Sequence, residues 1–168
     1  MLREIDDILA YLDALGIRTG TYTHPAVFTV EESLVHTAHL PGVHVKNLFL
    51  KDRKDRLWLV TCRHELRVDL VRLSKDLGAA RFSFGRPELL EEVLGVEPGS
   101  VTPLALVNDR GRRVQAVLDQ GILAAEELNC HPLRNTASTV LRSADLVRFL
   151  EATGHPPLVV PIPEIAAA

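Results

Sequence analysis

The sequence has little cysteine and no long apolar run. Its 168 residues include two cysteines, Cys62 and Cys130, too few for a disulfide framework, which indicates a reducing, cytoplasmic setting. Residues 1–12 carry acidic residues among apolar ones, so they predict an amphipathic helix rather than a signal peptide or a membrane span. No association with membranes is therefore expected.

Several catalytic motifs are absent as well. The chain has no phosphate-binding glycine loop, no HExxH and no GxSxG. His36, His39 and His44 lie near one another, but an expected helix end and a Pro-Gly turn separate them. No neighbouring cysteine or carboxylate completes a metal site, so neither a metal nor another cofactor is expected.

What is present fits one domain. The chain is 46% hydrophobic and 24% charged, and its length is ample for one buried core. It contains no repeat, no low-complexity segment and no linker long enough to divide it, so we predict a single domain over residues 1–168. Helical and strand patterns are mixed, with several hairpins, which predicts an α+β fold around a mixed sheet.

Spacing, caps and turns predict the individual elements. Helices are expected over 5–15, from the Thr29 capping box to about 37, over 68–77, from Pro87 to Gly95, and from a Ser143 cap to about 154. Strands are expected over 22–28, 43–50, 57–62, 101–107, 114–118 and 158–162, with 128–140 extended or irregular.

Charge is distributed unevenly along the chain. The net charge is -3, yet residues 46–81 hold ten Lys or Arg against five Asp or Glu. Such asymmetry suggests a face that meets a polyanion. Chance clustering on a solvated surface explains the charge equally well.

Two polar residues interrupt the apolar strand predicted over 43–50. Lys46 and Asn47 fall in its middle, where both faces are otherwise largely apolar. Burying an unpaired ammonium is costly, so Lys46 requires a partner or a cleft. A phosphate, a ribose oxygen or an internal carboxylate would serve; the alternative is a side chain whose head reaches solvent.

Two later segments have both an ordinary and a functional interpretation. Gly99-Ser-Val-Thr-Pro103 precedes an expected strand and could bring main-chain groups close to a ligand, although a tight turn is the commoner role. His131 follows Cys130, but adjacent strand residues point to opposite faces, so a Cys–His pair is not expected. Without further information, we expect Cys130 to be a small buried residue and His131 to have a structural role.

Four segments together carry a family resemblance. They are His24-Pro-Ala-Val-Phe-Thr-Val-Glu-Glu32, Pro41-Gly-Val-His-Val-Lys-Asn-Leu-Phe-Leu50, Gly99-Ser-Val-Thr-Pro103 and Cys130-His-Pro-Leu133. In this order they resemble the YbaK/EbsC family, which includes the inserted editing domain of bacterial prolyl-tRNA synthetase. The resemblance covers about Ile5 to Val160 and is nearest to the free-standing alanyl-tRNA(Pro) deacylases of the family.

The resemblance implies a barrel-like mixed sheet with surrounding helices, and an enzyme that needs no cofactor. Such enzymes cleave the ester that joins a wrong amino acid to the 3′ end of a tRNA. The matching positions are catalytic Lys46, His131, Gly99 and Pro103, and substrate-binding Asn47, His24, Ser100, Val101 and Thr102. The implied partners are the acceptor end of mischarged tRNA(Pro) and prolyl-tRNA synthetase.

Alanine is smaller than proline, so a tight pocket could exclude proline, but rejecting alanyl-tRNA(Ala) requires contacts with the tRNA. The candidates for phosphate contacts are Lys51, Arg53, Lys54 and Arg81. Other open interpretations are a deacylase for Cys-tRNA(Pro) or for Ser- or Thr-tRNA, a non-catalytic nucleic-acid-binding module, and a protein-interaction domain with a vestigial pocket.

Overall fold

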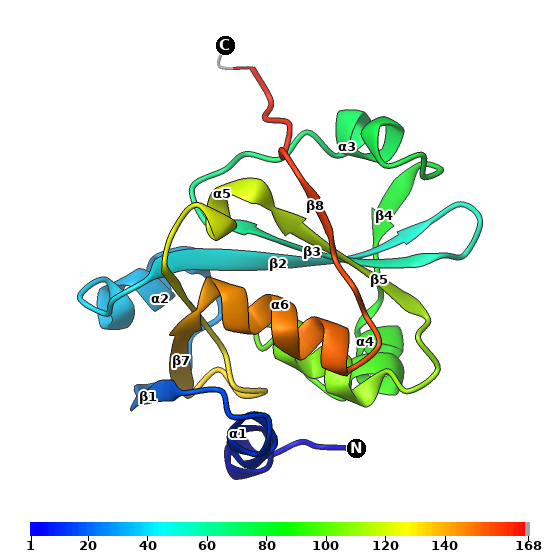
Figure 1. The fold of residues 1–168 in the computed structure, drawn as a ribbon. Coiled ribbons are helices and arrows are strands. Elements are labelled where there is room, and N and C mark those ends of the chain that lie inside the picture. The colour runs from blue at the N-terminus through cyan, green and yellow to red at the C-terminus, as the bar shows by residue number, and fades with distance from the viewer. Residues whose placement is uncertain (167–168) are drawn as a thin grey trace.

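A mixed sheet runs through the centre of the structure, a computed structural model that describes residues 1–166 (Figure 1). Its strands are β1 (Thr19–Thr23), β2 (Val43–Asp52), β3 (Leu57–Arg63), β4 (Phe82–Phe84), β5 (Val114–Asp119), β6 (Glu127–Cys130), β7 (Ala137–Arg142) and β8 (Leu158–Val160). They lie in the order β1-β7-β6-β2-β3-β5-β8, and β4 pairs with β2. Parallel and antiparallel pairs both occur, so the predicted α+β fold with a mixed sheet is confirmed.

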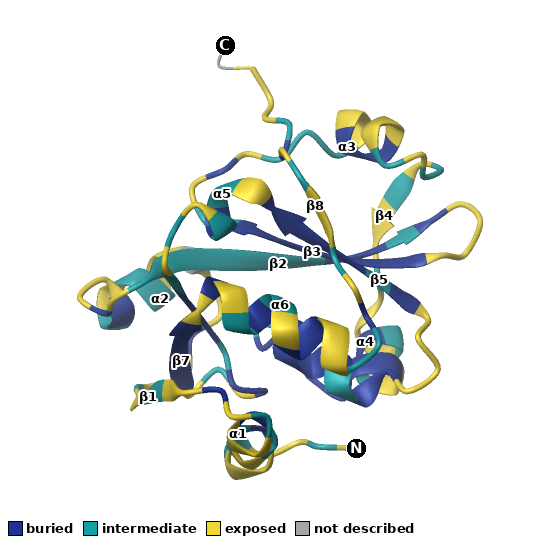
Figure 2. Ribbon diagram, in the orientation of Figure 1, coloured by how far each residue is buried: buried dark blue, intermediate teal, exposed yellow. Residues whose placement is uncertain are grey.

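Helices cover both faces of this sheet. They are α1 (Ile5–Ala14), α2 (Val30–Thr37), α3 (Leu70–Asp76), α4 (Pro87–Leu94), the 3-10 helix η1 (Pro103–Asn108), α5 (Gln120–Leu123) and α6 (Ser143–Ala152). The larger core packs α1, α4, η1 and α6 against one face, and a smaller core packs α3 against the other (Figure 2). Within residues 1–166 no helix has the length and hydropathy needed to cross a membrane.

The β2–β3 hairpin, which carries much of the candidate site, forms as predicted. Its register places Lys46 opposite Cys62 and Asn47 opposite Thr61. Side chains alternate along β2, so Leu48 and Leu50 pack in the smaller core while Phe49 packs in the larger one. A strand covered on both faces has little room for polar groups, which makes Lys46 and Asn47 informative.

Several helix signals also act as predicted. The Thr29 hydroxyl accepts from the N–H of Glu32, which caps α2. The Glu32 carboxylate accepts from the N–H of Phe28, one residue earlier than in a capping box. Pro87 begins α4, and Gly95 ends it in the left-handed conformation.

Three local predictions are wrong. Residues 101–107 form no strand: Pro103, which lacks an N–H, begins η1, and the Thr102 hydroxyl accepts from the N–H of Leu104. The first strand lies at 19–23 rather than 22–28, because Pro25 follows it instead of lying inside it. Ser143 does not cap α6; its hydroxyl donates to the carbonyl of Ile122, and Arg142 precedes the helix.

A buried polar cluster ties the loop after η1 to the segment after α6. Asp109 Oδ2 lies 3.0 Å from His155 Nε2, and both side chains are almost fully buried. Burial alone would raise the pKa of Asp109. Hydrogen bonds from His155 and from the N–H groups of Val114 and Arg113 outweigh burial, so this pKa lies below its ordinary value. The cluster stabilises the fold away from the candidate site.

Candidate functional site

The middle of β2 has one edge without a strand partner. On that edge β2 pairs with β6 at Val43 and His44 and with β4 from Leu50 onward. In the part of the chain that the structure describes, no strand joins this edge between those two contacts. The Gly99–Thr102 segment approaches here instead, and Asn47 Nδ2 donates to the Val101 carbonyl at 3.1 Å.

A cavity of about 240 Å³ opens at this interruption of the sheet. Its walls come from the segment before α2, from α2, from β2, from β6 and from the loops after β3, α4 and β6. The lining residues are Val27, Phe28, Thr29, Ser33, Leu34, His44, Val45, Lys46, Asn47, His64, Gly99, Val101, Asn129 and His131. The fold thus brings together Lys46, Asn47, Gly99, Val101 and His131, as the sequence predicted for a single site.

Lys46 has both the partner and the cleft that its position requires. Its ammonium donates to the main-chain carbonyl of Leu66, in the turn after β3. No Asp or Glu is among the residues that line the cavity. The cavity therefore offers a cation and neutral polar groups, which suits a substrate with negative or developing negative charge.

Asn47 organises the wall of the cavity. Its amide oxygen accepts from the Thr61 hydroxyl at 2.6 Å, which leaves the amide nitrogen to donate to Val101. This chain of hydrogen bonds fixes the Val101 carbonyl relative to the sheet. Much of the hydrogen-bonding capacity of Asn47 is therefore used in positioning the Gly99 loop.

Within residues 1–166, one ring nitrogen of His131 makes a hydrogen bond and the other makes none. Its Nδ1 lies 2.9 Å from the Ala137 carbonyl, and since a carbonyl only accepts, Nδ1 carries the proton and Nε2 is the unprotonated nitrogen. Burial lowers the pKa of His131 and the nearby His24 adds to the effect, against the opposing hydrogen bond to Ala137. The neutral, proton-accepting form therefore prevails at neutral pH.

The remaining predicted residues support the cavity without lining it. His24 lies beside His131, with ring centroids 6.3 Å apart, and hydrogen bonds to Pro25 and Ser138. Ser100, Thr102 and Pro103 are all buried and begin or precede η1. Gly99, which does line the cavity, has φ +90, a conformation that is strained for a residue with a side chain.

Cys130 does not act with His131. Burial raises the pKa of its thiol to about 12, which keeps it protonated and unreactive at neutral pH. The expectation of a small buried cysteine is confirmed, and no nucleophilic pair forms.

Sequence reasoning missed several lining residues, of which His64 and Phe28 are the most prominent. His64 follows β3, its N–H donates to the His44 carbonyl, and the two imidazoles meet edge to face at 5.6 Å. In the β2–β3 hairpin Val45 lies opposite Arg63, so the next pair along the two chains is His44 and His64. Phe28, 68% exposed, lies in the motif that starts at His24, but nothing in its spacing signals a cavity rim.

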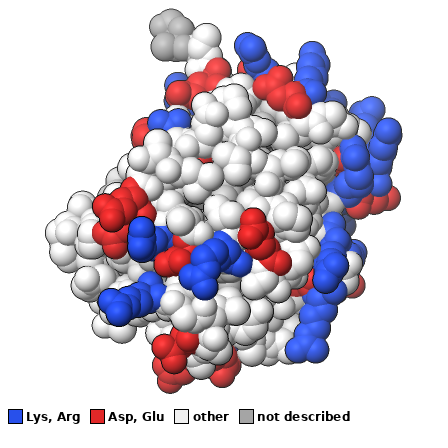
Figure 3. Space-filling view, viewed as in Figure 1, with Lys and Arg blue, Asp and Glu red and all other residues white. Residues whose placement is uncertain are grey.

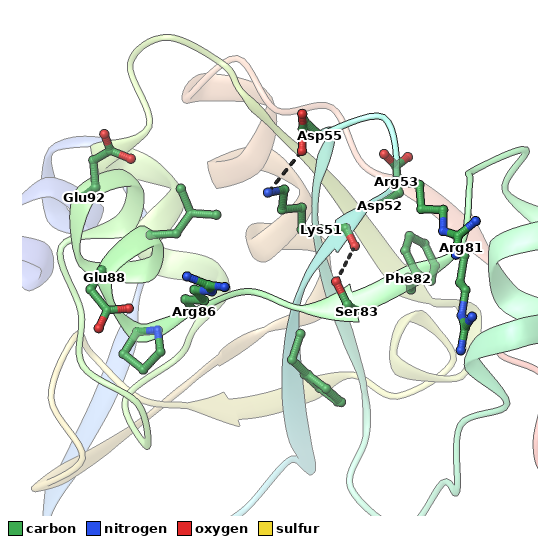
Figure 4. A pocket seen from close by; sticks show the side chains of 13 residues that line it. Lys51, Asp52, Arg53, Asp55, Arg81, Phe82, Ser83, Arg86, Glu88 and Glu92 are labelled. Atoms are coloured by element: carbon green, nitrogen blue, oxygen red, sulfur yellow. Dashed lines mark hydrogen bonds and ion pairs between the residues drawn. The ribbon is translucent and has the colours of Figure 1, made fainter.

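Three of the four predicted phosphate-binding residues line a second, open cavity of about 1360 Å³. Lys51, Arg53 and Arg81 line it together with Arg86, beside β4 and the start of α4 (Figure 4). Lys54 is exposed in the same hairpin loop but does not line the cavity. In Figure 3, Lys and Arg side chains gather along the edge of the molecule where Figure 1 shows β4 and the β2–β3 hairpin.

Four cations and four carboxylates line this second cavity, and the carboxylates are Asp52, Asp55, Glu88 and Glu92. Lys51 pairs with Asp55 at 3.0 Å. For Arg53, Arg81 and Arg86, no carboxylate within residues 1–166 lies at ion-pairing distance. The guanidinium groups are therefore available to an anionic partner.

Comparisons with known proteins identify the family of the chain. Residues 24–149 match the family described as aminoacyl-tRNA editing domain. The chain is 46% identical to prolyl-tRNA synthetase associated domain-containing protein 1 of Danio rerio, over 89% of this chain and 83% of that protein. It is 32% identical to the prolyl-tRNA editing protein ProX of Acetoanaerobium sticklandii, over 88% of this chain and 91% of that protein.

A solved structure described as a candidate trans-editing enzyme for prolyl tRNA synthetase superposes with a TM-score of 0.74. It is 22% identical and covers 98% of this chain and all of that one, so it supports the fold. The chain belongs to the aminoacyl-tRNA editing domain family, which confirms the resemblance predicted from the four motifs.

Proposed function

We propose that this protein is a deacylase that hydrolyses the ester of mischarged alanyl-tRNA(Pro). The observation that carries the proposal is one small cavity that joins Lys46, the Gly99 loop and Nε2 of His131. These groups can bind an aminoacyl ester, position water and stabilise developing charge. Family membership supports the reaction class.

The chemistry needs no metal because an aminoacyl ester is already activated. The reaction adds water to the ester carbon, breaks the bond to the ribose oxygen, and releases the amino acid and tRNA. In the proposed arrangement His131 Nε2 accepts a hydrogen bond from the attacking water or from the ribose 2′-hydroxyl that orients it. Lys46 and main-chain N–H groups beside the cavity stabilise the oxyanion.

The ribose 2′-hydroxyl gives this mechanism its own test. A substrate that ends in 2′-deoxyadenosine and carries alanine on the 3′-hydroxyl should be hydrolysed much more slowly than the ribose form. An unchanged single-turnover rate would exclude assistance by the 2′-hydroxyl and leave His131 as the sole orienting group.

A small cavity suits a small substrate amino acid. At about 240 Å³ the cavity is smaller than typical sites for small ligands, which occupy roughly 300–1,000 Å³. Its volume alone does not separate alanine from proline; a wall that fits alanine closely would reject the larger proline by steric clash. Cysteine is only slightly larger than alanine, so its exclusion has to be measured.

The decisive experiment measures deacylation of alanyl-, cysteinyl- and prolyl-tRNA(Pro) by the wild type and by Lys46→Ala. We expect hydrolysis of the alanyl ester alone, with most of the activity lost in the variant. Arg142→Ala, at an exposed residue away from both cavities, is the matched control and should retain full activity. Preferential cysteine release would assign a different substrate, and binding of tRNA without hydrolysis of any ester would favour a binding module.

The cationic side chains at the second cavity support an RNA partner. Lys51, Arg53 and Arg81, with Lys54 in the adjacent loop, are proposed to contact phosphates of the tRNA acceptor end. Such contacts weaken as salt rises, because each releases condensed counterions. Prolyl-tRNA synthetase, whose product would be corrected, is the proposed protein partner.

A further inference from the structure

The rim of the small cavity carries an aromatic ring that the reaction chemistry leaves unused. Phe28 lines the cavity and is 68% exposed, whereas Phe49 and Phe149 are buried in the larger core. An exposed aromatic side chain at the mouth of a site is a common feature of ligand recognition.

The segment that carries Phe28 is held in place on both sides. The N–H of Phe28 donates to Glu32 at 3.0 Å, and the carbonyl of Val27 accepts from Asn135 Nδ2 at 2.6 Å. The ring rests against Gly99, where an added Cβ would lie 3.1 Å from Phe28 Cδ1. Because the backbone is fixed and one part of the ring is supported, the exposed part forms a preorganised platform.

The groups around Phe28 do not suit a phosphate. The Glu32 carboxylate bonds to the Phe28 N–H, and the other cavity-lining residues of this segment, Val27, Thr29, Ser33 and Leu34, are uncharged. The cations and imidazoles of the cavity come instead from β2 and from the loops after β3 and β6. A flat, apolar, uncharged group is therefore the suitable occupant.

The covalent structure of the substrate identifies that occupant. In the proposed reaction the ester lies beside Lys46 and His131, which line the same cavity as Phe28. The base of the terminal nucleotide is attached to the ribose that carries the ester, so it has to lie at the rim when the ester is inside. We propose that Phe28 stacks on the 3′-terminal adenine of the RNA substrate. This inference rests on the proposed function and adds the subsite that holds the base.

Binding of unacylated RNA tests the proposal without any ester cleavage. Hairpins that reproduce the acceptor stem of tRNA(Pro) and end in either CCA or CC are titrated against the wild type, Phe28→Ala and Phe28→Trp. The wild type should bind the CCA hairpin more tightly, by roughly 5- to 150-fold, the range expected for one base stacked on an aromatic ring. Phe28→Ala should abolish most of that ratio, and Phe28→Trp should retain it.

Val35→Ala is the matched control, since Val35 is 78% exposed on α2 and does not line the cavity. It should leave the ratio of CCA to CC affinity unchanged. Thermal unfolding of each variant checks that the fold is intact. A wild type without preference for CCA, or a Phe28→Ala variant that keeps it, would overturn the proposal. So would a Phe28→Ala variant that loses only its preference for alanine over proline, which would make the ring a wall of the amino-acid pocket.

The two proposals fail in different ways. A wild type that binds CCA ends through Phe28 but cleaves no ester contradicts the deacylase proposal alone. Efficient cleavage with a Phe28-independent preference for CCA contradicts the stacking proposal alone.

Discussion

Replacing His131 by asparagine tests the proposed chemistry most directly. Asparagine is of similar size and can donate from Nδ2 to the Ala137 carbonyl, which replaces the 2.9 Å hydrogen bond of His131 Nδ1. It has no basic nitrogen in place of Nε2. The substitution therefore removes the proton acceptor while the wall of the cavity is largely kept.

General base catalysis by one positioned group contributes about 10²- to 10⁴-fold. We expect His131→Asn to lower kcat for alanyl-tRNA(Pro) within that range, with little change in KM, because the cavity that binds the ester keeps its shape. The assay is deacylation under saturating substrate, corrected for spontaneous hydrolysis at each pH. Thermal unfolding establishes that the variant is folded.

The pH profile gives a second, independent readout. The active form is neutral His131, and its pKa is lowered by burial. The wild-type kcat should therefore stay level as the pH falls from 8 through the ordinary histidine pKa of about 6.5, and decline only at lower pH. His131→Asn should lack this acidic decline. A variant that keeps kcat within about threefold of the wild type, or that shows the same decline, would refute a proton-accepting role.

Three further perturbations test other parts of the structure. Gly99→Ala forces a side chain to adopt φ +90 and to press on Phe28, so it should lower kcat/KM and cost about 1–2 kcal/mol in chemical unfolding. Asp109→Ala should cost about 1–3 kcal/mol in urea unfolding at pH 7 for each buried donor that it leaves unsatisfied. The pKa of Asp109 is lowered in the folded state, so its contribution to stability is present above about pH 4 and is lost as the pH falls below it. The difference in unfolding free energy between wild type and variant should therefore shrink in acid. An equal difference at pH 7 and in acid would contradict an ionised Asp109 in the folded state. Charge reversal at Arg53 and Arg81 should raise KM for tRNA and flatten its salt dependence while kcat is kept, and an unchanged salt slope would exclude phosphate contacts there.

Sequence patterns within a few residues predicted the β2–β3 hairpin and the start of α2. The hairpin of β2 and β3 follows from two apolar runs around a charged loop, and the Thr29 cap follows from hydrogen-bonding groups three residues apart. The segment 101–107 failed because a short buried apolar run has no period that separates strand from helix. Leu104, Ala105 and Leu106 are all buried in the larger core, so every one of them had to be apolar in either structure.

The candidate site was predictable in its centre and not at its rim. Lys46 and Asn47 stand out because polar residues are costly in a covered strand, and that cost is visible in one sequence. Phe28 gives no such signal, since a phenylalanine between a proline and a helix cap is equally consistent with burial. Its exposure depends on where the Gly99 loop and Asn135 hold the segment, which is a matter of tertiary structure.

The arrangement of the two cavities bears on how a deacylase of this kind would distinguish tRNAs. A pocket that admits alanine by size gives no protection to correctly charged alanyl-tRNA(Ala), and the terminal adenine proposed to stack on Phe28 is common to all tRNAs. Lys51 lies five residues along β2 from Lys46, about 16 Å away at strand spacing. That distance corresponds to roughly five stacked nucleotides at about 3.4 Å each. Contacts at the second cavity would therefore fall on the end of the acceptor stem. Phosphate contacts alone do not distinguish tRNA sequences, so discrimination between tRNA(Pro) and tRNA(Ala) should require Arg53, Arg81 or Arg86 to reach base edges there.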